Sequence, residues 1–129
     1  MSETCVSLKR ENSVARIDVS SAEVSGRYPV GNGPVQVYAT PDGSRVLVAN
    51  QGKTRNPGRT TSVLDARTGE NIGDVEVGAG AHGVTISLDR SRAFVTNTDD
   101  NTVSEIDIED LREIRRFESG TAPNGVAVR

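Results

Sequence analysis

The sequence predicts an all-β protein made of repeated antiparallel units, and three observations predict it. Valine, a β-branched residue that favours strands, is the most common residue, with 17 copies among 129 residues. Apolar residues occur in short runs, and these runs end in turn sequences such as Pro41-Asp42-Gly43. Landmark residues recur at a nearly constant interval. Short strands joined by tight turns are therefore favoured over a helical bundle.

Three segments of one pattern mark the repeat. They are residues 31–37, 78–84 and 120–126, which begin 47 and then 42 residues apart. Val48 and Val95 are 47 residues apart, whereas Leu64 and Ile106 are 42 apart, so the base period is 42 and five extra residues lie within 51–60. A period of about 40–45 residues built from hairpin-linked strands indicates the four-stranded blades of a β-propeller.

Each unit is expected to hold four antiparallel strands. In the third unit we expect them at 83–87, 93–97, 102–107 and 113–118. In the second unit the corresponding ranges are 35–40, 45–50, 61–65 and 71–77. The stretch 107–117 has a helix-like pattern, but it aligns with 65–77, which contains Thr68-Gly69. We therefore interpret it as a turn followed by a strand.

The chain is predicted to hold about three blades' worth of strands in an incomplete ring. As a single domain it divides into units of about 1–33, 34–80 and 81–122, with 123–129 starting a further blade. This gives twelve strands, cut between the first and second strand of a blade at both ends. Propellers close with about 4–8 blades. The chain is thus expected to be a β-propeller fragment completed by further blades of a longer parent chain, a homodimer closed by blade pairing, or an open monomer.

The string RAFVTN at 92–97, followed by NTVSEID at 101–107, resembles the YVTN β-propeller repeat. Phe94 stands where that repeat has tyrosine, and residues 88–90 lack the proline and glycine of its usual turn. The resemblance covers nearly the whole chain. It implies a WD40/YVTN-like fold of the kind found in surface-layer and periplasmic propellers, with distant likeness to lactonase-like enzymes and cytochrome d1 haem domains.

The resemblance implies two functions. The first is a non-enzymatic binding scaffold that presents a loop-rich face to a protein partner or a small anionic ligand. The alternative is a propeller enzyme or cofactor-binding domain, lactonase-like or of the d1-haem type, of which this chain is a part. The first is preferred, so no catalytic residue and no cofactor is assigned. Family members are often periplasmic or at the cell surface, although residues 1–5 do not resemble the start of a signal peptide.

Composition and charge further limit the partners and sites that this protein could have. A net charge of −3 argues against nucleic acid as a partner, because phosphate binding needs a basic excess. No apolar run reaches the roughly 20 residues of a membrane span. The single Cys5 and single His82 leave no internal disulfide and no His/Cys zinc cluster, so no metal site is predicted.

Four residues are candidate ligand-binding residues: His82, Lys53, Arg55 and Arg59. In an up-and-down blade, the loop between strands two and three shares a face with the loops that connect the blades, so these residues are expected at the mouth of the central channel. The three basic residues are interpreted as an anion or carboxylate clamp, or as a flexible charged loop. His82 is interpreted as a general base or axial metal ligand, or as a solvated loop histidine without a role.

Residues that recur at the same position of different units are expected to serve the fold. Asp18, Asp65 and Asp107 follow the third strand, where a carboxylate can accept backbone N–H groups of a turn. Asn50 and Asn97 follow the second strand and receive the same structural interpretation.

Overall fold

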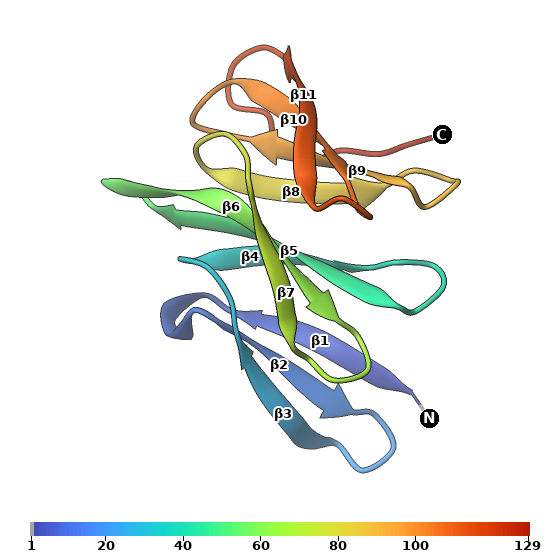
Figure 1. Cartoon of the computed structure of the whole chain (residues 1–129). Coiled ribbons are helices and arrows are strands. Elements are labelled where there is room, and N and C mark those ends of the chain that lie inside the picture. Colours follow the sequence, from blue (N-terminus) through green and yellow to red (C-terminus); the bar gives the residue numbers. More distant parts are fainter. Residues whose placement is uncertain (1) are drawn as a thin grey trace.

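Each repeat unit forms one antiparallel sheet in the computed structural model, which describes residues 2–129. The sheets lie one against the next, and strand order within each follows the chain (Figure 1). The first sheet holds β1 (Glu3–Leu8), β2 (Ser13–Asp18) and β3 (Glu23–Pro29), with a short 3-10 turn, η1 (Lys9–Glu11), after β1. The second holds β4 (Pro34–Ala39), β5 (Arg45–Lys53), β6 (Asn56–Asp65) and β7 (Asn71–Glu76). The third holds β8 (Ala81–Ile86), β9 (Arg92–Asn97), β10 (Thr102–Asp107) and β11 (Arg112–Glu118).

The predicted fold class is confirmed, because the structure is all-β and its sheets have the form of partial β-propeller blades. The helix-like stretch 107–117 forms a turn and β11. The predicted twelfth strand does not form, because within residues 2–129 no strand follows Glu118. A strand is defined by its ladder, and the segment after Glu118 has no neighbouring strand with which to form one. Among residues 2–129, no helix combines the length and the apolar character that crossing a membrane requires.

The insertion at 51–60 is ordered as a hairpin. It lengthens β5 and β6 beyond the predicted strands, with Gly52 opposite Pro57 and Lys53 opposite Asn56. Gly52 has a φ of +74°, and a side chain at this position would collide with the backbone of Gly58 across the hairpin. The insertion is therefore part of the second sheet and not an irregular loop. The extra residues extend the second sheet past its neighbours (Figure 1).

The core lies between the sheets, as blade packing requires. Val14, Val46, Val48 and Leu64 pack between the first and second sheets. A larger cluster, which includes Leu47, Val63, Val95 and Ile106, packs between the second and third. Burial at a given repeat position therefore depends on whether another sheet covers it.

Asn50 and Asn97 each form a buried polar cluster at the end of the second strand of their sheet. Asn97 is fully buried, and its Nδ2 donates to Thr102 Oγ1 at 3.0 Å and Ser104 Oγ at 2.9 Å. Asn50 is also fully buried and donates to the corresponding hydroxyls at 3.0 and 2.9 Å. The amides join adjacent strands through side chains, which confirms their structural role.

Candidate functional site

A groove lined by basic residues lies between the first and second sheets, on the face that carries η1 and the β5–β6 hairpin. A hollow of about 550 Å³ is lined by Lys9, Arg10, Gly33, Gly52 and Lys53, and we call these residues the basic groove. An adjoining hollow of about 350 Å³ shares Lys9, Gly52 and Lys53 with it. The groove thus joins a turn of one sheet to a hairpin of the next.

Backbone hydrogen bonds hold the floor of the groove. The Gln51 N–H donates to the Gly33 carbonyl at 2.9 Å, and the Gly52 N–H donates to the Asn32 carbonyl at 3.0 Å. Gly33 has a φ of +61°, and a Cβ at this position would lie 2.7 Å from the Gly52 carbonyl oxygen. The two chain segments approach this closely because both positions are glycine. The hairpin is therefore docked on the loop that leads into β4.

Three cationic side chains and no carboxylate line the larger hollow. Lys9 is held toward the hairpin, because its Nζ donates to Gln51 Oε1 at 3.0 Å. The acidic side chain of Asp99 lines only the smaller hollow. Like charges gathered in a concave site produce a positive potential, which an anion would neutralise. The arrangement is suited to binding carboxylate or phosphate groups.

The structure separates the three predicted basic residues. Lys53 lines both hollows. Arg55 lies in the turn between β5 and β6, where it is exposed and makes no hydrogen bond or ion pair with residues 2–129. Arg59 lies on β6, where its Nη1 is 3.9 Å from Asp100 Oδ2, and it lines a different cavity of about 620 Å³ beside β7 and β11.

Sequence reasoning missed two members of the groove, Lys9 and Arg10. They occupy the loop after the second strand of the first unit, which is the loop type that the sequence places on this face. The corresponding residues of the third unit are Thr98 and Asp99, 89 positions later. The basic character is thus specific to one junction between units and is not required by the repeat.

His82 is part of β8 and does not line the groove. It lies in an irregularity of the β8–β9 ladder, between the pairs Ala81–Asn97 and Val84–Val95. The side chain is half-buried, and its Nδ1 is covered without a hydrogen-bond partner within residues 2–129. A bulge re-aims side chains, so His82 is set in the inner strand and is not a solvated loop residue. Residues 2–129 hold no group of three or more His, Cys, Asp or Glu placed to bind a metal ion.

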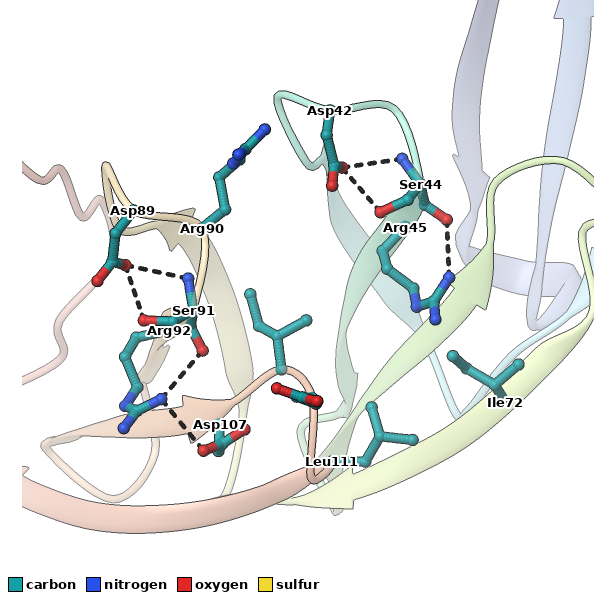
Figure 2. A pocket seen from close by; sticks show the side chains of 12 residues that line it. Asp42, Ser44, Arg45, Ile72, Asp89, Arg90, Ser91, Arg92, Asp107 and Leu111 are labelled. Atoms are coloured by element: carbon teal, nitrogen blue, oxygen red, sulfur yellow. Dashed lines mark hydrogen bonds and ion pairs between the residues drawn. The ribbon is translucent and has the colours of Figure 1, made fainter.

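Another cavity, of about 540 Å³, lies between the second and third sheets, at the ends of the strands opposite to the basic groove (Figure 2). Three of the four carboxylates that line it, those of Asp42, Asp89 and Asp107, are engaged in the turns around it. Asp42 accepts bonds from the N–H and the hydroxyl of Ser44, and Asp89 does the same with Ser91. Arg92 pairs with Asp107 at 3.1 Å. Most of the polar groups here stabilise the fold, so this cavity is the weaker candidate for a ligand.

The aspartates predicted to cap the turns after the third strand do so. Asp18 Oδ1 accepts the N–H groups of Ser20 and Ser21, and Asp65 Oδ1 accepts those of Arg67 and Thr68. Asp107 Oδ1 accepts the Asp110 N–H. The Ser20 hydroxyl, which donates to Asp18 Oδ1 at 2.6 Å, lowers the pKa of Asp18 together with these N–H groups, and the N–H groups lower the pKa of Asp65 and Asp107.

Replacing Asp89 with asparagine is expected to reduce the amount of stability that the protein loses between neutral and acidic pH. Hydrogen bonds from Ser87 and Ser91 lower the pKa of Asp89 to about 2. A carboxyl group with a lowered native pKa contributes stability above its unfolded pKa of about 3.9, and that contribution is lost as the pH falls toward about 2. Urea denaturation at pH 6 and pH 3 measures the effect. Asp110→Asn, on an exposed carboxylate of a different turn, is the control, and equal acid slopes for wild type and Asp89→Asn would contradict the prediction.

Almost the full length of this chain matches part of a known protein structure. The chain is similar to Kuenenia stuttgartiensis hydrazine synthase, with a TM-score of 0.87 and 26% sequence identity over 96% of this chain. The match covers 35% of the hydrazine synthase chain, so this chain spans about a third of that protein's length. No family model and no curated protein match the sequence. The structural match supports a β-propeller-like class of protein.

Proposed function

We propose that this chain is a binding module of the YVTN-type β-propeller class, which holds a small anionic ligand in the basic groove. The ligand carries carboxylate or phosphate groups. One observation carries the proposal: Lys9, Arg10 and Lys53 line a single hollow of about 550 Å³ that no carboxylate lines. Small-molecule sites are usually clefts of about 300–1,000 Å³.

Two further features support this function. The floor of the groove is fixed by backbone hydrogen bonds, so a ligand would meet a largely preformed site. The basic residues of the groove also belong to one junction of the repeat, where the five-residue insertion extends the hairpin. A feature that the other units lack is not needed to build a blade, which favours a role in binding.

Citrate and inorganic phosphate are suitable probes, with binding measured by isothermal titration calorimetry at low ionic strength. We expect Lys53→Gln to weaken binding of the preferred probe about threefold to tenfold, because a charged hydrogen bond contributes about 1.5 kcal/mol or less at an exposed site. The double variant Lys9→Gln/Lys53→Gln should abolish binding.

The matched control is Arg112→Gln, which removes an exposed cation outside the groove and should leave affinity unchanged. Affinity should also fall as salt is raised, because the site is open to solvent. Unchanged affinity in the double variant would contradict the proposal, as would the absence of binding by the wild type at millimolar probe concentrations.

The similarity to part of an enzyme chain favours one alternative, a propeller domain that contributes to a larger enzyme or cofactor site. His82 is the residue of this chain that such a site would use, because it lies on an inner strand and carries an unsatisfied Nδ1. Titration with haem tests the cofactor form of this alternative. A Soret shift that is lost in His82→Ala supports it, and identical spectra for the two proteins contradict it.

A further inference from the structure

The first sheet has an open strand edge. β1 pairs with β2 along one side, and no strand within residues 2–129 pairs with its other side. In the other two sheets the corresponding strands are β5 and β9, and their corresponding edges pair with the inner strands β4 and β8. Within residues 2–129 the first sheet therefore has no counterpart of the inner strands β4 and β8, and the backbone groups along that edge of β1 form no ladder there.

Residues 122–124, which follow β11, make the same contacts as the residues that lead into an inner strand. The Ala122 N–H donates to Asn101 Oδ1 at 2.9 Å, as the Gly33 N–H does to Asn12 Oδ1 at 2.9 Å. Thr96 Oγ1 donates to the Asn124 carbonyl at 2.7 Å, which reproduces the bond from Ser7 Oγ to the Val35 carbonyl at 2.7 Å.

These two pairs of contacts show that residues 122–124 lie on the third sheet as residues 33–35 lie on the first. Residues 34–39 go on to form the inner strand β4. The segment after Glu118 thus begins as an inner strand begins, and no strand within residues 2–129 pairs with its continuation at 125–129.

The outer face of the first sheet also has the character of an uncovered blade interface. Val48 and Val95 are fully buried against the preceding sheet, whereas Val6, at the same repeat position, is 40% exposed. Val19 and Val24 of the same sheet are exposed as well. At the other end of the stack, Phe117 of β11 is exposed at the repeat position where Val75 is buried. The two end sheets thus present apolar surfaces of the kind that pack together inside the chain.

We propose that residues 123–129 of one copy pair antiparallel with β1 of a second copy, and that the second copy pairs with the first in the same way. The closed assembly would contain six four-stranded blades, within the usual range of about 4–8. The interface continues the one between sheets of a single chain, and it is independent of the proposed anion site. The occupant of the open edge is therefore a second copy of this chain.

The repeat predicts the register of this pairing. In the third sheet, Val84 lies opposite Val95, Thr85 opposite Phe94 and Ile86 opposite Ala93. Transferring these pairs by the repeat spacings of 42 and 89 places Val126 opposite Val6, Ala127 opposite Cys5 and Val128 opposite Thr4. Cys5 is the sole cysteine, so it reports on this register.

The test is cross-linking of the full chain carrying Ala127→Cys, treated with a mild thiol oxidant. Directly opposed residues in antiparallel strands bring their Cβ atoms to about 4.5–5.5 Å, close enough for a disulfide after a small adjustment. We expect most of the protein to run as a covalent dimer on a non-reducing gel and as a monomer after reduction. Light scattering of the unmodified chain should give twice 13.7 kDa.

Val128→Cys is the matched control, because its side chain would point to the opposite face of the sheet from Cys5 and should cross-link at most weakly. A strict monomer at 13.7 kDa across micromolar concentrations would overturn the proposal. So would a dimer in which both variants cross-link equally, since the register would then be wrong. Open filaments of increasing mass would show that the junctions form without closing a ring, which also overturns the two-copy assembly.

Discussion

Replacing Ile106 with alanine is expected to lower the free energy of unfolding by about 3 kcal/mol, within the range of about 2–5 kcal/mol for such core truncations. Ile106 lies on β10 and is fully buried in the cluster between the second and third sheets. The substitution removes buried apolar surface and leaves a cavity between two sheets that cannot move together freely. Because this interface joins two blades, the loss should be seen in one cooperative transition.

Chemical denaturation of wild type and variant, at the same protein concentration, measures this loss. Leu88→Ala is the matched control, because it removes a side chain of similar size that is 79% exposed in the turn before β9. Its effect should stay within about 0.5 kcal/mol. Equal losses for the two variants would mean that the interface between these sheets contributes little to stability.

Asn97→Ala is expected to destabilise the protein by about 2–4 kcal/mol, because it removes two hydrogen bonds and takes away the amide donor of the buried Ser104 hydroxyl. Asn97 is fully buried, and it donates to Thr102 at 3.0 Å and to Ser104 at 2.9 Å. Ser104 in turn donates to Glu113. Removing one amide therefore disturbs hydrogen bonding across three strands.

A double variant tests the cluster as a unit. In the first sheet the positions of Asn97 and Ser104 are occupied by Leu8 and Ala15, so the blade tolerates an apolar pair there. We expect Asn97→Leu/Ser104→Ala to be more stable than the sum of the single changes by at least about 1 kcal/mol. Urea denaturation of the wild type, the two single variants and the double variant measures the coupling free energy between the two positions. Additive losses would contradict the coupling.

Much of the fold could be predicted because its determinants are local. Strands such as β10 were located to the residue, since alternation of apolar and polar side chains and turn residues such as Asp107 act over a few positions. The repeat spacing then showed that strands group into blades. The expected strand at 123–129 does not form within residues 2–129, because a strand also needs a partner and no local pattern shows whether one is present.

The candidate site was predicted only in part. Of the residues singled out from the sequence, Lys53 is the one that lines the basic groove. The sequence grouped Lys53 with Arg55 and Arg59 because they are neighbours in the chain. In the structure Lys53 ends β5, Arg55 lies in the turn, and Arg59 lies on β6 near Asp100, so the three side chains are separated. Lys9 joins Lys53 from a different sheet, a contact between residues more than forty positions apart.

The sequence by itself determined the all-β class, the four-strand period and the turns, because these depend on interactions between residues close along the chain. Only the tertiary structure decided which cations share a groove and which valines are covered. Val6 and Val48 have the same residue type at the same repeat position, yet one is 40% exposed and the other is fully buried. The difference arises because burial depends on the sheet packed against each residue, and this neighbour is set by long-range packing.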